Sequence, residues 1–495
     1  MLVGAAVGTL GLASPAAASG FTVARFGGEH GHPASPNPTS VYYNPAGMAL
    51  SKGTHILIDA NLAGRFVTYE RPIEAVSPGT APSSETYAPG ANAGTAELSN
   101  FIASPALFVT SDFGTDFIYG GLGLYFPFGG QATWNANEQY EGDAQFPGAG
   151  AGVQRWHTMD GTVRSMYITG ALAFDIKKAG LTLGISGSAI KSEFDTIRAR
   201  NGDGSDDLVA SYDSSTGDLG DIKEGRAWLQ VEGWQYGIAA GLTWDISKLY
   251  GKDESLIFGL SYTSQPNVTG GMRLKGTLST VLAALDPDTK DVEFEQTLPD
   301  IIRFGFRYKP SDKYELRVFG DYQRWSVMDK QCVLEVGADC TIEGEDSSLS
   351  AKEQRDAIFD NPGAYGADSV GGNVIQNIPR YWKDGGGARI GVSYWFLEPL
   401  ETYFGLGYDS SAVPDQTLDA SLLDLEKVTV SLGAKWQATK WFALAATSTQ
   451  VIYFSKDTNG QSIFNEVNGA SKQPSADGRY SQFITVGNLY TEFMF

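Results

Sequence analysis

The stretch Phe483-Ile484-Thr485-Val486-Gly487-Asn488-Leu489-Tyr490-Thr491-Glu492-Phe493-Met494-Phe495 decides the fold that we expect. In an extended chain one face carries Phe495, Phe493, Thr491, Leu489 and Gly487, and the other carries Met494, Glu492, Tyr490 and Asn488. A lipid-facing side that alternates with a polar side is the pattern of a membrane β-strand. A closing aromatic such as Phe495 is typical of outer-membrane barrels, and the barrel-assembly machinery would recognise it there. The alternative is the last strand of a soluble sandwich.

The first residues indicate export. Leu2 to Ala13 is apolar, and Ser14-Pro15-Ala16-Ala17-Ala18 offers a small-residue cleavage site. The positive charge that normally precedes such a stretch is missing, which indicates an upstream start codon or a trimmed chain. We expect a cleaved signal peptide at 1–18, because this stretch is too short to span a bilayer as a helix.

The composition fits a barrel with acidic loops. The 495 residues include 60 glycines and 12% aromatic residues, and the net charge is −21. Mean hydropathy is slightly negative, but alternation along membrane strands averages hydrophobicity away. The strong negative charge argues against nucleic acid as a partner.

Alternating segments and the spacing between them predict a 14-stranded antiparallel transmembrane β-barrel. The strands should be centred near residues 60, 105, 121, 169, 186, 237, 259, 304, 319, 390, 405, 431, 447 and 488. Long connections should lie near 70–97, 128–162, 196–226, 267–298, 326–379, 410–425 and 456–480, and short turns between them. Long loops on one end and short turns on the other are typical of outer-membrane barrels with both termini in the periplasm.

An additional segment precedes the first predicted strand. Residues 19–52 contain Pro33, Pro36, Pro38 and Pro45, which exclude long regular elements. A wide barrel has room for such a segment in its lumen, so we expect an N-terminal hatch at 19–52 and the barrel at 53–495. A disordered periplasmic leader is the alternative.

Several short motifs, in order, carry a family resemblance. They are Ser40-Val41-Tyr42-Tyr43-Asn44-Pro45-Ala46-Gly47-Met48-Ala49, Gly121 to Gly129, Phe258 to Ser264, Leu298-Pro299-Asp300 with Asp321 to Ser326, Trp382-Lys383-Asp384, and Gly407 to Asp415. Together with the strand count and Phe495, they resemble the long-chain fatty-acid transporter (FadL-type) family of outer-membrane proteins. That family includes aromatic hydrocarbon transporters.

The resemblance implies passive uptake of long-chain fatty acids or other hydrophobic compounds. It places a hatch corner at Asn44, Pro45 and Ala46, and a kinked third strand through which substrate leaves sideways into the membrane. In this sequence Pro127 lacks a ladder donor, and Gly129 and Gly130 would weaken the strand that follows. From the residues alone, Pro127 is equally well read as the end of a strand.

Substrate capture and head-group binding have sequence candidates. Leu278, Val281, Leu282 and Leu285 are spaced as one apolar helical stripe in an external loop, which would form a capture groove or pack on a neighbouring loop. A carboxylate would need a cation in the lumen, for which Arg324, Arg380 and Lys383 are the principal candidates, with Arg164 and Lys191 further ones. Pairing of each cation with a luminal acid is the alternative.

Other signals are weak. Cys332 and Cys340 should form a small disulfide in a loop. His30 and His32 are too few for a metal site, and 201–207 only faintly resembles a calcium loop. We therefore expect no enzyme, no metal and no cofactor.

The resulting hypothesis is a monomeric barrel in the bacterial outer membrane, whose partners are membrane lipids and a hydrophobic small molecule. The alternatives are an aromatic hydrocarbon channel, a diffusion channel for small polar solutes, and a surface adhesin or receptor that does not transport.

Overall fold

The computed structural model describes residues 25–77, 87–213, 215–249, 254–268, 271–282, 286–366, 373–467 and 470–495. The predicted signal peptide at 1–18, residues 19–24 of the predicted hatch and Leu285 of the predicted groove lie outside these ranges.

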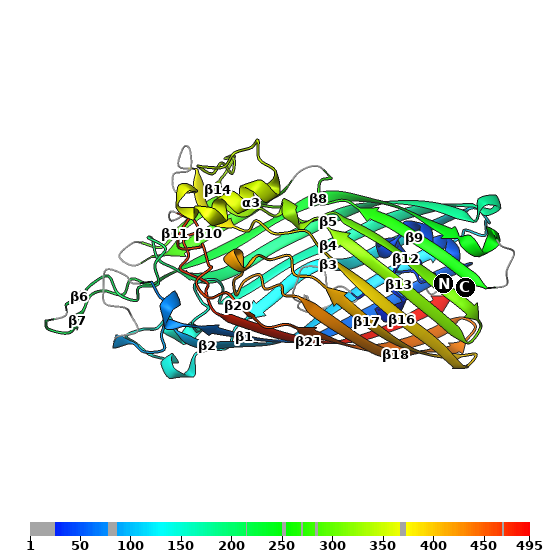
Figure 1. Cartoon of the computed structure of the whole chain (residues 1–495), viewed down its shortest axis with the longest axis horizontal. Coiled ribbons are helices and arrows are strands. Elements are labelled where there is room, and N and C mark those ends of the chain that lie inside the picture. Colours follow the sequence, from blue (N-terminus) through cyan, green and yellow to red (C-terminus); the bar gives the residue numbers. More distant parts are fainter. Residues whose placement is uncertain are drawn as a thin grey trace, which may run out of the picture.

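Fourteen antiparallel strands in the described residues close a barrel (Figure 1). In order around the wall they are β1 (Thr54–Arg71), β2 (Gly94–Ser111), β3 (Ile118–Thr133), β4 (Asp160–Ile176), β5 (Leu181–Arg200), β8 (Gly225–Asp245), β9 (Ser255–Thr263), β12 (Ile301–Ser311), β13 (Tyr314–Gln323), β16 (Gly385–Leu397), β17 (Leu400–Asp409), β18 (Lys427–Thr439), β19 (Phe442–Tyr453) and β21 (Arg479–Met494). β21 pairs with β1 from His55↔Met494 to Glu70↔Arg479, which closes the ring. The predicted strand number and centres are confirmed.

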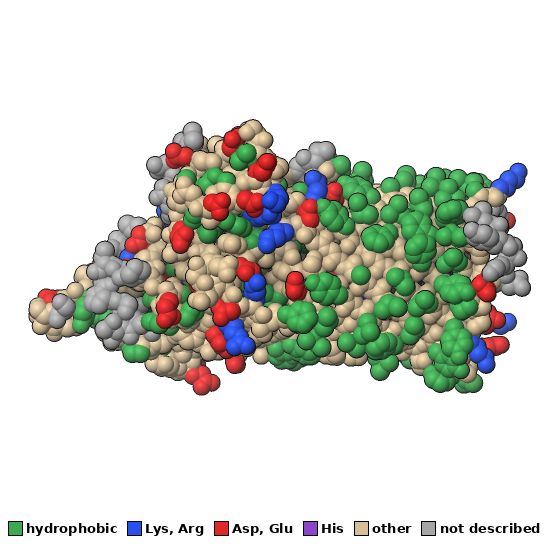
Figure 2. Space-filling view, viewed as in Figure 1, with side chains coloured by type: hydrophobic (Ala, Val, Ile, Leu, Met, Phe, Trp, Pro, Cys, Tyr) green, Lys and Arg blue, Asp and Glu red, His purple; other side chains and the backbone are tan. Residues whose placement is uncertain are grey.

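Alternation builds the wall as predicted. In β21, Ile484, Val486, Asn488, Tyr490 and Glu492 are buried, while Phe483 and Leu489 are exposed. Hydrophobic side chains cover the part of the wall nearest the C-terminus, and charged side chains gather at the far end (Figure 2). An apolar outer band around a polar interior is what a lipid bilayer requires of a barrel.

The two ends of the barrel differ. Short connections such as 112–117 and 398–399 lie at the end that holds Phe495, here called the turn end. Long connections lie at the opposite loop end. No helix among the described residues is long and apolar enough to cross a membrane.

Additional strands extend the wall at the loop end. They are β10 (Met272–Val281), β11 (Asp288–Gln296), β14 (Lys330–Glu335) and β15 (Val374–Pro379), with the small pairs β6 (Tyr212–Asp213) and β7 (Asp218–Leu219), and β20 (Lys456–Asp457) on β21. β8 divides its pairing between two neighbours: residues 226–232 pair with β10, and 239–245 pair with β9. Helix α3 (Ala351–Asp360) lies beside this extension and begins with a capping box of Ser350 and Glu353 (Figure 1).

The predicted helical stripe is wrong. Leu278 and Val281 belong to β10, where Leu278 is buried and Val281 is 53% exposed. The spacing i, i+3, i+4 matches a helix, but the β-branched residues Thr277, Thr280 and Val281 favour a strand, and the long outer part of β8 offers this strand a partner. The stripe is therefore not one face of a helix.

Residues 25–52 lie inside the barrel. They form the short helix α1 (Ser40–Tyr43) and the 3-10 helices η1 (Gly28–His30) and η2 (Pro45–Leu50), and η2 contacts β3, β4, β5 and β8. Further 3-10 turns occur at η3 (Ile73–Ala75), η4 (Glu138–Tyr140), η5 (Ala149–Ala151), η6 (Lys177–Ala179), η7 (Ile246–Leu249), η8 (Trp325–Val327), η9 (Pro362–Ala364) and η10 (Asp415–Thr417). Segment 25–52 is called the luminal segment below.

Candidate functional site: a seam in the wall and the lumen behind it

One joint of the barrel wall is incomplete. β2 pairs with β1 along its whole length, and β3 pairs with β4 as far as Thr133↔Asp160. The β2–β3 ladder, in contrast, runs only from Ser111↔Gly120 to Leu107↔Leu124, and beyond it an isolated bridge joins Leu98 to Trp134. Residues 99–106 of β2 and 125–133 of β3 thus face each other without a ladder. We call this stretch the seam.

Local sequence explains where the seam begins. The β3–β4 register shifts between Tyr125 and Phe128, so Phe126 and Pro127 form a bulge. Pro127 has no N–H to offer β2, and β2 carries its own proline, Pro105, just beyond the last paired residue. Sequence reasoning identified Pro127 but missed Pro105, although a proline inside a strand was a visible signal.

Side chains replace part of the missing ladder. The Arg65 Nη1 donates to the backbone oxygen of Gln131 at 3.1 Å. The Asn100 amide, in its better orientation, donates to the Thr133 oxygen at 3.0 Å and accepts from the Thr133 N–H at 3.1 Å. Because unpaired backbone groups are costly inside a membrane, these contacts stabilise an otherwise open joint.

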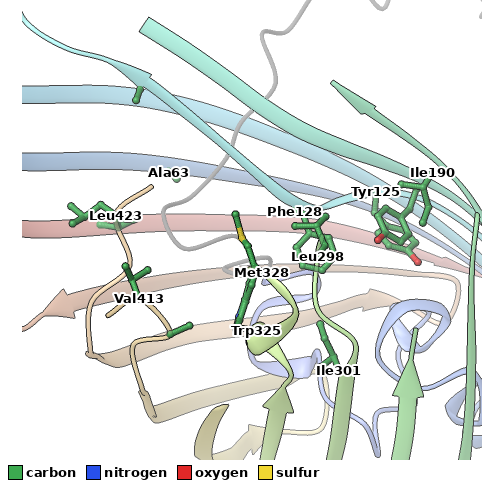
Figure 3. Packing of buried hydrophobic residues seen from close by; sticks show 14 of the residues in the cluster. Ala63, Tyr125, Phe128, Ile190, Leu298, Ile301, Trp325, Met328, Val413 and Leu423 are labelled. Carbon is green, nitrogen blue, oxygen red and sulfur yellow. The ribbon is translucent and has the colours of Figure 1, made fainter. Parts of the chain in front are cut away.

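Aromatic side chains line the inner side of the seam. Phe108 stacks on Tyr125 at 5.3 Å between ring centroids, and Tyr125 stacks on Tyr167 at 5.7 Å. Tyr42 of the luminal segment meets Tyr125 edge-on at 5.2 Å. Figure 3 shows that buried side chains in this interior come from the wall and from the loops, among them Tyr125, Phe128, Trp325 and Leu423.

Two cavities adjoin the seam. The first, called the lower cavity, lies against the luminal segment and is lined by Tyr42, Tyr125, Pro127, Phe128, Tyr167 and Arg303, among others. The second, called the upper cavity, is lined by Gly129, Gly130 and Gln131 of β3 and by apolar side chains of the loop at 410–426. Of the predicted kink residues, Pro127 therefore lines the lower cavity, and Gly129 and Gly130 line the upper one.

The luminal segment is held by its predicted corner. The Asn44 amide donates to the Leu242 oxygen of β8 at 2.9 Å and to the Pro33 oxygen at 2.7 Å, and its Oδ1 accepts from the Ala46 N–H at 3.1 Å. Pro45 is the first residue of η2. The backbone N–H at this position has no partner within a helix, so a proline there loses no hydrogen bond.

The wall is shaped to receive this corner. A Cβ on Gly184 of β5 would lie 2.3 Å from the Ala46 nitrogen, and one on Gly241 of β8 would lie 2.1 Å from the Asn44 Oδ1. Arg303 of β12 adds a cation–π contact, with its guanidinium 4.5 Å from the centre of the Tyr42 ring. Sequence reasoning missed all three residues. The glycines were visible as inward positions of strands, but what approaches them was not.

The turn end of the lumen is charged. A cavity of about 320 Å³ lies between the luminal segment and this end. Three of the acids that line it are paired: Glu401 with His30 at 3.1 Å, Glu492 with Lys435 at 2.7 Å and with His55 at 2.9 Å, and Glu315 with Arg307 at 2.8 Å. We call these residues the floor. Such a network suits water and polar groups rather than a hydrocarbon.

The predicted head-group cations are mostly engaged elsewhere. Arg324 pairs with Asp300 at 2.7 Å, and buried Arg380 pairs with Asp419 at 2.9 Å. Burial would raise the pKa of the Asp419 carboxyl, but the charge of Arg380 holds that pKa below its usual range. Lys383 is exposed at the loop end. The further candidates Arg164 and Lys191 both pair with Glu193.

The remaining predicted features lie apart from the seam. Cys332 and Cys340 are disulfide-bonded, with their Cα atoms 6.1 Å apart. In the loop at 201–207, Lys223 pairs with both Asp203 and Asp207. Within the described ranges no three His, Cys, Asp or Glu side chains gather as a metal site would need.

Comparison with known proteins places the chain. Residues 12–480 match the model of a family described as outer membrane protein transport protein (OMPP1/FadL/TodX). The chain belongs to this family. Membership in the OMPP1/FadL/TodX family confirms a transporter of hydrophobic compounds in the outer membrane, rather than an enzyme. No curated protein matched the sequence.

Solved structures show the same fold. A Pseudomonas aeruginosa FadL homologue has a TM-score of 0.70 at 15% identity, covering 96% of this chain and 100% of that one. The P. putida toluene transporter TodX reaches a TM-score of 0.58 at 13% identity, covering 93% and 94%. The Ralstonia pickettii toluene transporter TbuX reaches 0.54 at 14% identity, covering 92% and 94%.

Proposed function

We propose that this protein takes up long-chain fatty acids or related hydrophobic compounds without an energy source. Substrate enters from the loop end, the luminal segment gates it, and it leaves the barrel sideways through the seam into the bilayer. The driving force is binding followed by partition of apolar surface into lipid.

The seam carries the proposal. It is a stretch of wall without a β-ladder, and its inner side is lined by Tyr125, Phe128 and Tyr167. An apolar molecule that passes there moves from aromatic side chains to lipid without crossing water. Exit toward the periplasm would instead take it past the ion pairs of the floor, where it gains no apolar contact.

Gating would act through the corner at Asn44. One side-chain hydrogen bond joins the corner to β8, from the Asn44 amide to the Leu242 oxygen, and Tyr42 and Val41 next to the corner line the lower cavity. A substrate that fills this cavity contacts the luminal segment directly, so binding and release of the corner are coupled by contact.

Capture at the loop end remains part of the proposal, although not through a helical groove. Leu278 is buried within the β8–β10–β11 extension, whereas Val281 is exposed at its outer edge. We propose that the exposed edge near Val281 offers a first apolar contact.

A channel for aromatic hydrocarbons is the second candidate. TodX and TbuX are described as toluene transporters, and the rings of Phe26, Tyr42, Phe108 and Tyr125 form one continuous cluster behind the seam. Such a cluster accommodates flat rings as well as alkyl chains.

Two further parts of the proposal concern assembly. We propose that the single barrel is the transporting unit, and that Phe495 is the residue read by the assembly machinery. Phe495 is 74% exposed, and its backbone pairs with Thr54 at the open rim of the turn end.

The test is to close the seam. Deleting Phe126 and replacing Pro127→Val removes the bulge and supplies a ladder donor. The matched control deletes Lys309 and replaces Pro310→Val, because β12 has the same kind of proline bulge between Tyr308 and Ser311 at the turn end. Uptake of labelled oleate and of labelled toluene is measured in cells that lack their own transporter, after barrel insertion is verified.

We expect uptake by cells with the seam-closed variant to fall to that of cells without the protein. Cells with the control variant should take up as much as cells with the intact protein. Equal uptake by both variants would refute lateral exit. If the intact protein takes up neither oleate nor toluene, the proposed function fails as a whole, and a polar diffusion channel or a receptor takes its place.

A further inference from the structure

Three cations lie together at the loop end, beside the outer end of β5. Arg198 and Arg200 occupy alternate positions of this strand, so both side chains lie on its inner face, and they are 6% and 8% exposed. Arg198 Nη1 donates to the backbone oxygen of Lys472 at 3.2 Å, which places the loop segment 470–478 against the strand. Arg198, Arg200 and Lys472 are called the cationic junction below.

Many hydrogen-bond donors of the junction have no acceptor. Arg198 Nη1 donates to two backbone oxygens, those of Trp156 and Lys472, each at 3.2 Å. The Nη2 of Arg198 and the Nε and Nη1 of Arg200 are buried, and no acceptor among the described residues reaches them. Buried N–H groups without an acceptor are costly, so three of them at one place favour a partner from outside the chain.

The charge of the junction is not compensated by the acids around it. Asp203 and Asp207 both pair with Lys223, and Asp419 pairs with Arg380 at 2.9 Å. In the part of the chain that the structure describes, no carboxylate lies within ion-pair distance of the junction. Like charges that are held together away from water repel one another, so the position favours an anion.

Lys472 connects the junction to a second loop and to solvent. Burial, together with the charge of Arg200, lowers the pKa of the Lys472 ammonium. The loop at 201–207 packs against the same residue, since a Cβ on Gly204 would lie 3.3 Å from the Lys472 Cα. Lys472 is only half-buried, so a small ion can reach the junction beside it.

A second unpaired cation sets the junction apart from other buried arginines. Within the described ranges Arg25, Arg65 and Arg303 also lack an ion pair, but each donates to neutral oxygens. None of these three lies next to another arginine that lacks a carboxylate partner. Arg198 and Arg200, in contrast, are two residues apart on one face of one strand, with Cα atoms about 7 Å apart.

We propose that the cationic junction binds an oxyanion of the phosphate class. Arginine forks take phosphate oxygens through paired hydrogen bonds, and a phosphate group carries more than one negative charge at neutral pH. A carboxylate brings a single charge and two oxygens, which leaves part of the junction uncompensated. The bound anion joins the end of β5 to the loops at 201–207 and 470–478. This site is separate from the seam and goes beyond the proposed function.

The experiment measures binding of inorganic phosphate to the purified full-length protein in detergent, by calorimetry at constant ionic strength. Acetate is the singly charged comparison. Arg200→Gln removes one cation of the junction, and Arg226→Gln is the matched control, because Arg226 is exposed on the neighbouring strand β8. Lipid A in mixed micelles is tested in a separate arm, which decides whether a lipid phosphate or free phosphate is the source.

We expect the intact protein to bind phosphate at least about tenfold more tightly than acetate, since acetate forgoes a hydrogen bond to a charged group. Arg200→Gln should bind phosphate about ten- to a hundredfold more weakly, and Arg226→Gln should bind it as the intact protein does. An equal loss in both variants would show attraction by overall charge and would overturn the site.

The intact protein alone also decides, should Arg200→Gln not fold. Phosphate that binds no more tightly than acetate would refute the proposal. Limited trypsin digestion gives a second measurement: phosphate, but not acetate, should slow cleavage after Lys472. Because no arm uses a transported compound, failure of this site leaves the proposed function untouched, and failed uptake of oleate and toluene leaves the site untouched.

Discussion

The seam and the floor treat polar groups in opposite ways. At the floor, charged side chains such as Glu492 and Lys435 meet within ion-pair distance around a cavity of about 320 Å³. At the seam, the polar groups are backbone groups of β2 and β3, joined in places by Asn100 and Arg65, and the side chains behind them are aromatic.

The difference favours the proposed exit of an apolar molecule through the seam. Entry of a hydrocarbon into the cavity at the floor is unfavourable, because it would displace water from the charged side chains without giving them new hydrogen bonds. A missing ladder leaves a gap whose sides are already apolar. The luminal segment separates the two regions, so its position should decide which of them a solute reaches.

Displacing the luminal segment should have the largest effect. Gly184→Ala places a Cβ 2.3 Å from the backbone nitrogen of Ala46, whereas a Cβ on Gly187 of the same strand meets nothing within 4 Å. We expect Gly184→Ala to destabilise the segment by about 1–3 kcal/mol and to raise the sensitivity of cells to a large polar antibiotic. Gly187→Ala should behave as the intact protein. Identical sensitivity of the two variants would contradict the view that this corner seals the lumen.

Weakening the floor should lower stability and spare uptake. Lys435→Met removes a partner of Glu492 and leaves His55 at 2.9 Å. We expect a loss of about 1–3 kcal/mol, since the buried carboxylate of Glu492 loses one of its donors. Thermal unfolding of the purified barrel measures the loss, and oleate uptake is followed in parallel. A fall in uptake as large as that of the seam-closed variant would mean that substrate passes the floor.

Removing the disulfide should have the smallest effect on transport. The disulfide joins Cys332, within β14, to Cys340 in the loop that follows this strand, and β14 belongs to the extension at the loop end rather than to the seam or the floor. The double change Cys332→Ser and Cys340→Ser should lower the local stability of this loop by about 2–3 kcal/mol. Limited proteolysis on intact cells should show faster cleavage there, with unchanged oleate uptake. Loss of uptake would instead assign this loop to substrate capture.

The sequence predicted the fourteen strands because membrane strands must alternate and must be joined by turns of unequal length. It did not predict β10, since a strand outside the bilayer has no lipid face, and Leu278 and Val281 happened to match a helical spacing. At the seam, Pro127 was recognisable in the sequence as a break in a strand. The roles of Pro105 and Asn100 could not be predicted, because they depend on which part of β3 lies opposite these residues.

The remaining site residues depend on distant neighbours. Gly184 and Gly241 are needed because the corner at Asn44 presses on them, and that contact joins segments far apart in sequence. The partners of the luminal arginines could not be predicted either, because the sequence does not show which acids lie near them in the folded barrel. Alternation, in contrast, can be recognised within each strand.

The hydrogen bonds between Thr54 and Phe495 carry a consequence for the order of assembly. The Thr54 N–H donates to the Phe495 oxygen at 3.0 Å, and the Phe495 N–H donates to the Thr54 oxygen at 2.8 Å, so the first and last wall residues meet. The pairing of β1 with β21 therefore joins the two most distant strands of the wall. Because contacts between residues far apart in sequence carry the largest cost in chain entropy, we expect this pairing to be the slowest step of folding, with the luminal segment enclosed as it forms.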